Sequence, residues 1–430
     1  MDQGWDVDVV VVGGGAMGSA TAWALARRGT QVTLLEQFEP GHVRGASHGA
    51  GRIFRLGYTD PSHVRLAQHA HRWWDVLQEE SGERLLTLNG CVDHGPVLAL
   101  RDLAQTLQDC DVPFEYMTGL EAQARWPGMR LDDRAIVQPI AGRAHADRTV
   151  ATLQSEAVRH GAQVRHGARV LSIDVEDGGA VLRVAGVPAA EGGAAPEVEV
   201  IRARAVVVAV GAWTAGLLAG LPGLEGLPRL VVTQEQPAHF PVRDEALVAG
   251  DDWPSFIHHV DPEGHAAARG DLGADPAYPR LGVYGHHTPG VGIKVGHHGT
   301  GPVVDPDQRD FAAEPGRLAA LRDYVRDWFP GVDADAPEPI SCTYTTTPDE
   351  RFLLDRVGPV VLGAGFSGHG FKFTPGIGQI LASLALGEEP EAPGVDLAAF
   401  ALARFASDAP AEPAGSAEPA GSAEPVAVAG

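Results

Sequence analysis

Cysteine and positive charge are both scarce in this chain of 430 residues. Three cysteines (Cys91, Cys110 and Cys342) make neither a disulfide framework nor paired metal-ligand spacing, so we expect no bound metal and a reducing compartment. The net charge of −23 disfavours partners such as nucleic acid or an anionic membrane. No basic segment precedes a long apolar run, and the apolar stretch 7–12 is too short to span a membrane. These absences predict a soluble cytoplasmic protein.

The first 36 residues show the order strand, glycine-rich turn, helix, strand and acid. The positions are a strand over 7–12, the pattern G-x-G-x-x-G at Gly13, Gly15 and Gly18, a helix over 19–28, a strand over 31–35, and Glu36. The glycines permit close backbone approach, the helix N-terminus offers N–H groups to a pyrophosphate, and the acid accepts hydrogen bonds from ribose hydroxyls. A turn without ligand is the alternative. The complete order favours a dinucleotide, and the acid favours FAD or NAD over NADP.

Small residues surround one histidine and two arginines between positions 44 and 55. Ser47 and His48 are followed by Arg52 and Arg55, which are three positions apart. If the two arginines share one turn of backbone, both side chains face the same side. A solvated basic loop is the alternative interpretation.

Periodicity and turn residues predict the intervening elements. We expect helices over 62–81, 101–109, 147–160 and 214–219, and strands over 163–165, 170–175 and 204–210. The apolar strand 204–210 ends at Gly211 and suits a parallel strand of the nucleotide domain, with an ordinary core strand as the alternative. Trp73 and Trp74 are expected to pack in the core. We predict surface loops over 186–196 and 261–278, and a disordered tail.

Two C-terminal stretches carry reactive side chains in unusual settings. Lys294 lies within an apolar strand over 292–298 that also carries His298, which indicates function unless this is an edge strand. Cys342 begins a β-branched run, and a later loop carries Gly365, Gly368 and Gly370, followed by Lys372. Such a loop allows the backbone to approach a planar ligand. By residue type alone Cys342 is an inert buried thiol, and we expect Cys91 and Cys110 to be structural.

Together these motifs resemble the monomeric sarcosine oxidase and N-methyltryptophan oxidase family of FAD-dependent amine oxidases. The resemblance extends from residue 7 to about 405 and leaves out 261–278 and the tail. It is carried by Cys342-Thr343-Tyr344, by 347–352, by the loop 365–373, by Ser47-His48-Gly49 with the two arginines, and by Lys294 with His298. His297 stands where the family often has an aromatic or basic residue, which leaves the pocket shape open, and Tyr284 is not assigned.

The resemblance implies a role for each matched residue. Cys342 corresponds to the cysteine that forms a thioether with the flavin, and Arg55 with Lys372 would bind the substrate carboxylate. Lys294 would support oxygen reduction, Arg52 and His48 would adjoin the flavin ring, and His298 would line the amine pocket. The remaining cofactor-binding residues would be Gly13, Gly15, Gly18, Glu36, Ser47, Gly211, Gly365, Gly368 and Gly370.

The implied fold is α/β, with a Rossmann-like FAD domain and a second substrate domain built on a mixed or antiparallel sheet. We predict that the FAD domain comprises 1–86, 145–230 and 340–405, the substrate domain 87–144 and 231–339, and the tail 409–430. The implied enzyme oxidises a secondary amino acid, such as sarcosine or N-methyltryptophan, with dioxygen as acceptor and hydrogen peroxide as product. A cyclic imino acid substrate such as pipecolate or proline, or a dehydrogenase with another electron acceptor, is the alternative. We expect a monomer.

Overall fold

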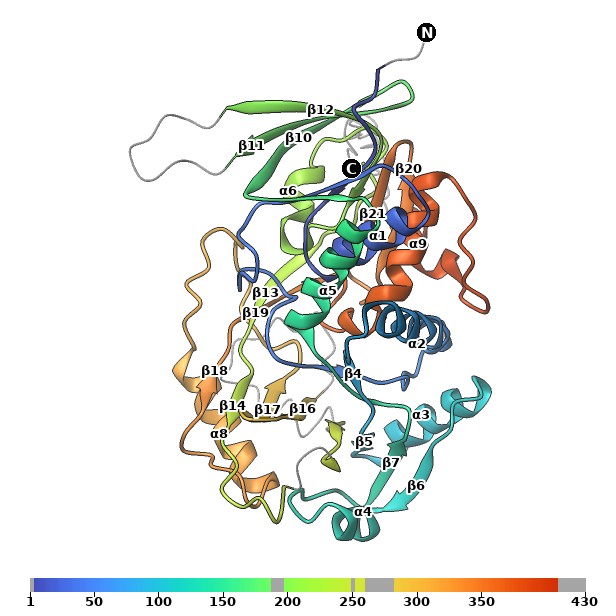
Figure 1. The fold of residues 1–430 in the computed structure, drawn as a ribbon. Coiled ribbons are helices and arrows are strands. Elements are labelled where there is room, and N and C mark those ends of the chain that lie inside the picture. The colour runs from blue at the N-terminus through green and yellow to red at the C-terminus, as the bar shows by residue number, and fades with distance from the viewer. Residues whose placement is uncertain (1–3, 187–196, 249–251, 260–281, 409–430) are drawn as a thin grey trace, which may run out of the picture.

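A computed structural model describes residues 4–186, 197–248, 252–259 and 282–408. The molecule is elongated, with one large sheet near each end (Figure 1). Most of the predicted loop over 186–196, all of the predicted excursion over 261–278 and the tail from 409 lie outside the described residues. No helix within the described ranges is long and apolar enough to cross a membrane.

The first large sheet is built around the apolar N-terminal strand. Its path is β10-β11-β12-β1-β2-β9, with β21 paired to β12 and β20 paired to β21. The strands are β1 (Val7–Val12), β2 (Val32–Glu36), β9 (Gln163–His166), β10 (Ala168–Glu176), β11 (Gly179–Gly186), β12 (Val198–Val208), β20 (Leu353–Val357) and β21 (Val360–Ala364). β1 pairs in parallel with both β2 and β12. Its side chains also pack into a core on each face of the sheet, which explains its nearly continuous valine sequence.

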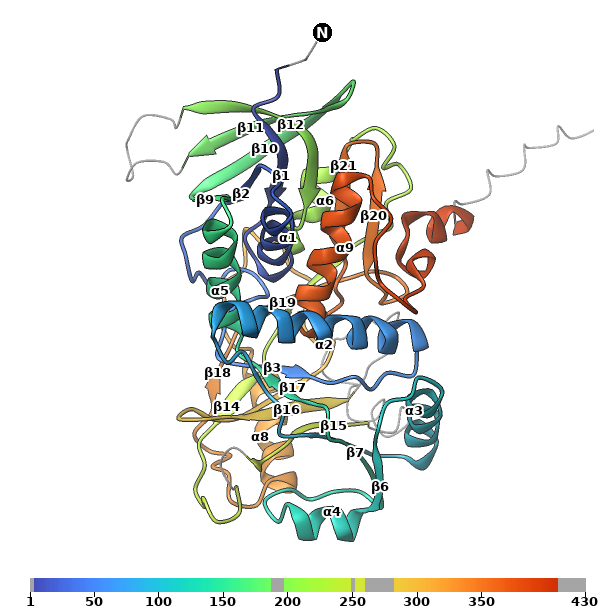
Figure 2. The ribbon, with the colours of Figure 1, turned by 45° about the vertical axis from the view of Figure 1, so that its right-hand side comes forward.

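Helices pack on one face of this sheet. α1 (Ala16–Arg27), α5 (Ala146–Arg159) and α9 (Thr374–Leu386) lie together beside it, and α2 (Pro61–Ser81) crosses below them (Figure 2). Val9 and Val11 pack with Trp23 of α1 in the larger core. Val10 and Val12 pack into a second core on the opposite face. Alternation along a single strand thus supplies both cores.

The second large sheet has the order β18-β14-β17-β16-β15-β5-β7-β6. Its strands are β5 (Cys91–His94), β6 (Glu115–Thr118), β7 (Arg134–Gln138), β14 (Ala238–Phe240), β15 (Ser255–His258), β16 (Val283–Thr288), β17 (Gly292–His297) and β18 (Glu338–Pro339). α8 (Pro315–Trp328) packs on it through a core that includes Phe240, Phe256 and Val325. β17 lies between β14 and β16, so the interpretation of Lys294 as an edge-strand residue is wrong.

Short elements connect the two ends. β3 (Arg52–Phe54), β4 (Leu86–Thr87) and β8 (Gly142–Ala144) form one small sheet, and β13 (Val231–Glu235) pairs with β19 (Cys342–Thr346) in another. The remaining elements are α3 (Val97–Asp109), α4 (Gly119–Arg125), α6 (Thr214–Leu218) and the 3-10 turns η1 (Gly211–Trp213), η3 (Phe371–Phe373), η4 (Leu397–Phe400) and η5 (Leu402–Asp408). We propose that each large sheet forms the centre of one domain with the boundaries predicted above.

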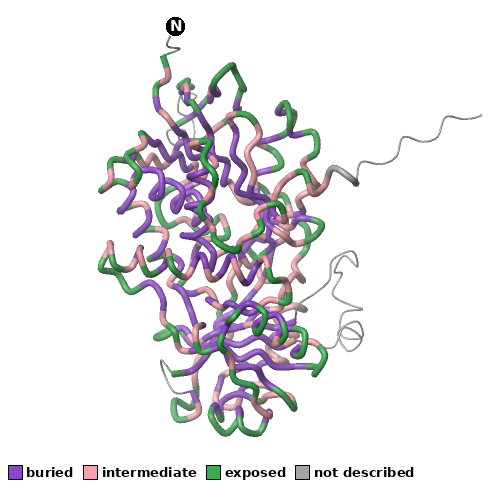
Figure 3. Tube along the Cα trace, turned by 90° about the vertical axis from the view of Figure 1, so that its right-hand side faces the viewer, coloured by how far each residue is buried: buried purple, intermediate pink, exposed green. Residues whose placement is uncertain are grey.

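Several predicted elements have different bounds. α1 begins at Ala16 instead of residue 19 because the glycine turn itself caps the helix at Gly15. β12 begins at Val198, earlier than predicted, since its first half pairs with β11 as a hairpin. Residues 52–54 form a strand, so the condition that Arg52 and Arg55 share one turn of backbone is not met. The packing prediction for Trp74 is confirmed by its complete burial. Both ends of the molecule contain buried residues (Figure 3).

Candidate active site

One large cavity runs between the two sheets. Its volume is about 1370 Å³, and its lining extends from the glycine turn after β1 to Cys342, Lys294 and Lys372. β1 and α1 supply one wall, β17 and β19 supply another, and the loop before η3 supplies a third. Segments that are more than 300 residues apart in sequence therefore line one continuous space.

Backbone geometry defines the end of the cavity near β1. Gly13 has φ 101°, and a Cβ atom there would lie within 2.5 Å of the Ala209 carbonyl oxygen. A Cβ atom at Gly18 would clash with the Gly13 carbonyl oxygen. Ser47 Oγ accepts a 2.9 Å hydrogen bond from the Ala16 N–H and so caps α1. Only glycine fits this turn, and the turn brings backbone N–H groups to the cavity wall.

The acid at the end of β2 completes this part of the cavity. Glu36 is buried and accepts hydrogen bonds from the backbone N–H groups of Gly14 (2.7 Å) and Phe38 (3.0 Å). Burial acts to raise the pKa of Glu36, but a hydrogen bond with His42 and these backbone bonds hold that pKa below its ordinary value. A carboxylate that stays charged beside the glycine turn can accept hydrogen bonds from the hydroxyl groups of a ribose.

The middle of the cavity is cationic. Lys294 is 5% exposed and forms no hydrogen bond with the described residues. Burial, together with the charge of Arg52, lowers the pKa of Lys294 to about 7. Arg52 donates to the carbonyl oxygens of Gly51 and His48, and its Nη2 lies 3.9 Å from Cys342 Sγ. Burial and these two cations lower the pKa of His48 to about 3, so its imidazole is neutral.

The far end holds two cations of different character. Arg55 lies over the Tyr58 ring at 4.6 Å and faces Asp93 at 3.8 Å. Lys372 Nζ donates to the Tyr58 hydroxyl (2.8 Å) and to the His369 carbonyl oxygen (2.7 Å), both neutral groups. Burial and the charge of Arg55 therefore lower the pKa of Lys372 well below its ordinary value. A bound carboxylate would supply the negative charge that these partners do not.

Neutral polar groups complete the wall beside these cations. The Tyr344 hydroxyl lies 3.3 Å from His298 Nδ1 and 3.4 Å from the Tyr284 hydroxyl. Burial, with the charges of Lys372 and Arg55, lowers the pKa of His298 to about 4. The imidazole is thus neutral at pH 7 and can contact an uncharged amine without repelling it.

The cavity brings together nearly all of the residues predicted from sequence. The lining residues among them are Gly13, Gly15, Glu36, Ser47, His48, Arg52, Arg55, Gly211, Lys294, His298, Cys342, Gly368, Gly370 and Lys372. Gly18 and Gly365 do not line it: a Cβ atom at Gly365 would clash with Thr347, so both glycines serve backbone packing. Sequence reasoning missed Tyr58, Asp93 and His259. The one available signal was a pair of polar residues, Asp93-His94, inside a short apolar stretch.

These features fit FAD. The glycine turn and helix N-terminus suit a pyrophosphate, Glu36 suits a ribose, and the cavity continues past both toward a cationic chamber. At Gly368 any Cβ atom would clash with the Tyr344 ring, so the loop before η3 packs closely while keeping its backbone at the cavity wall.

Comparisons with known proteins agree with this assignment. The family model described as FAD dependent oxidoreductase matches residues 8–384. Monomeric sarcosine oxidase of a Bacillus species is 30% identical over 88% of this chain and 92% of its own length. A probable sarcosine oxidase of Arabidopsis thaliana is 32% identical over 93% of this chain and 92% of its own length. N-methyl-L-tryptophan oxidase of Yersinia pestis is 26% identical over 93% of this chain and 100% of its own length.

Solved structures give the same result. NikD, an unusual amino acid oxidase essential for nikkomycin biosynthesis, superposes with a TM-score of 0.74 at 26% identity over 92% of this chain and 97% of its own. Glycine oxidase from Geobacillus kaustophilus has the same fold at a TM-score of 0.70, with 21% identity over 93% and 98%. The chain belongs to the FAD dependent oxidoreductase family and is an FAD-dependent amine oxidase related to monomeric sarcosine oxidase.

Proposed function

We propose that this enzyme oxidises a secondary amino acid, with sarcosine or N-methyltryptophan as the leading substrates. The observation that carries the proposal is the pair Arg55 and Lys372, which line the same cavity as the FAD-binding turn. Two cations in a buried chamber select a carboxylate. The choice of an N-methylated amine follows the names of the relatives, which are oxidases of sarcosine and N-methyl-L-tryptophan.

The neutral histidine beside these cations favours the amine in its uncharged form. With the carboxylate on Arg55 and Lys372, the amine is left near His298. FAD, when bound, accepts a hydride from the carbon next to the amine nitrogen, which leaves an imine that water hydrolyses to an aldehyde and an amine. Only an uncharged amine has the lone pair that this oxidation requires. No side chain need act as a general base if the amine binds neutral.

The cations in the middle of the cavity suit oxygen as the electron acceptor. Lys294 and Arg52 place positive charge where negative charge develops during reduction of dioxygen to hydrogen peroxide. The alternative is a dehydrogenase that uses another acceptor, and it leaves an unpaired buried lysine without a role.

We further propose a covalent bond between Cys342 and FAD. Cys342 begins β19, lines the cavity and lies 3.9 Å from Arg52 Nη2. The proposed linkage is a thioether from its sulfur. Monomeric state is proposed from the names of the bacterial relatives. Cytoplasmic location stays a prediction, because the relatives also include proteins named peroxisomal.

Two measurements test these proposals. Acid precipitation of the purified protein should leave the yellow colour in the pellet, and colour in the supernatant alone would reject the thioether. Incubation in air with N-methyl amino acids and with cyclic imino acids should release hydrogen peroxide. Peroxide from pipecolate or proline alone would replace the N-methyl assignment, and FAD reduction without peroxide would favour the dehydrogenase.

A further inference from the structure

A buried carboxylate lies behind the proposed substrate site. Asp93, on β5, is 0% exposed. Its Oδ1 accepts a 2.8 Å hydrogen bond from His259 Nε2, and its Oδ2 accepts one of 2.6 Å from Gln138 Nε2. Although burial opposes its charge, these bonds and the nearby Arg55 hold the pKa of Asp93 below its ordinary value. Asp93 is therefore a fixed anion directly behind two cavity-lining residues, Arg55 and His259.

The contact between Asp93 and Arg55 is one of charge and not of hydrogen bonding. Arg55 Nη1 lies 3.8 Å from Asp93 Oδ1, and Arg55 donates no hydrogen bond to the described residues. Both Asp93 oxygens are already engaged by His259 and Gln138. The N–H groups of Arg55 thus remain available to a ligand, while its charge is partly balanced from behind. Lys372 has no such counter-charge among its hydrogen-bond partners.

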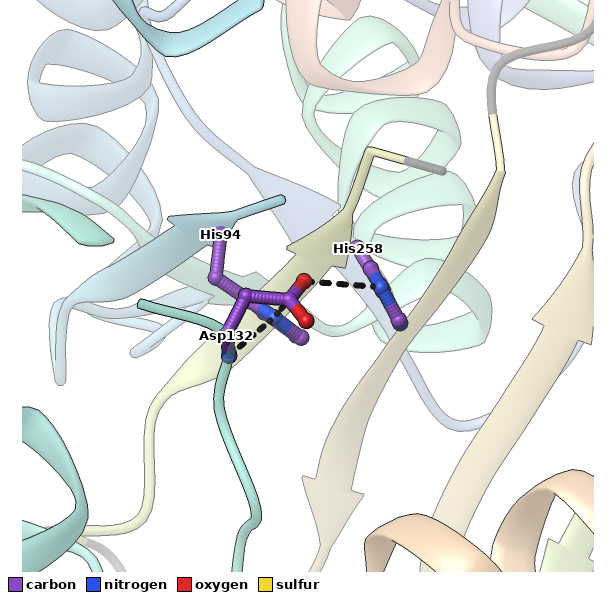
Figure 4. A group of neighbouring side chains, drawn as sticks. All are labelled: His94, Asp132 and His258. Atoms are coloured by element: carbon purple, nitrogen blue, oxygen red, sulfur yellow. Dashed lines mark hydrogen bonds and ion pairs between the residues drawn. The ribbon is translucent and has the colours of Figure 1, made fainter. Parts of the chain in front are cut away.

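The next residue of the same strand points to the other face of the sheet. His94 and His258 are neighbours in the parallel pair β5–β15, and both contact Asp132, at 3.3 Å and 3.0 Å (Figure 4). The two imidazole rings stack at 4.2 Å with 26° between their planes. The three residues form a cluster of hydrogen bonds and ion pairs around Asp132. None of its three residues lines the cavity, which makes Asp132 a matched control.

We propose that Asp93, held by His259, is a specificity-determining residue that restricts the substrate site to ligands with a single carboxylate. The inference rests on the proposed function, since it takes Arg55 and Lys372 as the carboxylate site. With Asp93 charged and Lys372 protonated, as it would be beside a bound carboxylate, Arg55 and Lys372 together offer about one net positive charge, which one carboxylate balances. A second carboxylate would bring an unbalanced negative charge into a buried chamber, which is costly.

Asp93→Asn tests this charge with little change of shape. Gln138 Oε1 is buried and has no partner, so rotation of the Gln138 amide lets it accept from the new amide group. The probes are acetate and malonate at constant ionic strength, and their dissociation constants are measured on the holoenzyme from the absorbance change of bound FAD. Removal of one negative charge should strengthen the binding of both anions, and the binding of malonate, a dianion, should be strengthened more than that of acetate. The preference for malonate over acetate should rise about tenfold or more, while Asp132→Asn leaves it unchanged.

The outcomes separate this inference from the proposed function. If the unmodified protein binds acetate and Asp93→Asn leaves the malonate preference unchanged, or weakens both anions equally, Asp93 is structural and the inference is wrong. If neither anion perturbs FAD in the unmodified protein, the carboxylate site itself is wrong. A second measurement needs no variant: unmodified protein should bind acetate at least as tightly as malonate, and a clear preference for malonate would also overturn the inference.

Discussion

The two ends of the cavity are built on different principles. The dinucleotide end depends on backbone: Gly13 and Gly18 are required because a Cβ atom at either would meet carbonyl oxygens. The substrate end depends on charges carried by Arg55, Lys294 and Lys372. Burial and a neighbouring arginine lower the pKa of each lysine, whereas the effect of burial on Arg55 is outweighed by Asp93, which raises its pKa. We therefore expect an added side chain at the dinucleotide end to abolish FAD binding, and a change of charge at the substrate end to alter reaction rates by degrees.

The largest expected effect is at the backbone-defined end. Gly18→Ala should abolish FAD binding, because the new methyl group would overlap the Gly13 carbonyl oxygen and displace the turn. Gly226→Ala is the matched control, since nothing lies within 4 Å of a Cβ atom there. The FAD content of the purified variants provides the measurement. Normal FAD content in Gly18→Ala would show that the turn can accommodate a Cβ atom at this position.

Lys294→Met should affect one half-reaction selectively. Loss of the cation should slow reoxidation of FAD by dioxygen on the order of 100-fold or more, the size typical for removal of a transition-state charge partner. Reduction by substrate should change far less. Stopped-flow absorbance separates the two steps. Equal slowing of both would remove the proposed oxygen role from Lys294.

The same variant should also change the pH dependence of stability. Folding lowers the pKa of Lys294 from 10.5 to about 7, so between these values the unfolded chain binds more protons than the folded one. The free energy of unfolding of the parent should therefore rise with pH above 7, relative to Lys294→Met, by up to about 1.4 kcal/mol per unit. Denaturant titrations at pH 6 to 9 measure the difference. A difference that is constant with pH would contradict the lowered pKa.

The smallest effect is chemical and exploits the lysine content. The chain has two lysines, Lys294 and Lys372, and both line the cavity. A small amine-acylating reagent should modify Lys294 at a rate that rises with pH and levels off above about pH 7, because only the neutral amine reacts. Mass spectrometry of the two lysine peptides follows the reaction. A rate that keeps rising tenfold per unit to pH 9 would show an ordinary lysine.

The same contrast explains what the sequence could predict. The dinucleotide turn was readable because its requirements are local: spacing of Gly13, Gly15 and Gly18 between a strand and a helix. Asp93 and His259 were not, because they are 166 positions apart and meet only through the pairing of β5 with β15. The pKa shifts of Lys294 and Lys372 likewise depend on burial that periodicity does not reveal. Lys294 could be singled out as unusual in its strand, but the central position of β17 was unpredictable from sequence.

The central claim is that one cavity joins FAD to a carboxylate-binding amine site. The most direct test is to mix the holoenzyme anaerobically with sarcosine and with N-methyltryptophan while recording FAD absorbance. We predict that at least one of them bleaches FAD and that bleaching is much slower in Arg55→Met. When oxygen is then admitted, the colour should return and hydrogen peroxide should form. Colour that persists with every N-methyl amino acid tested, or bleaching that is unaffected by loss of the Arg55 charge, would contradict the account.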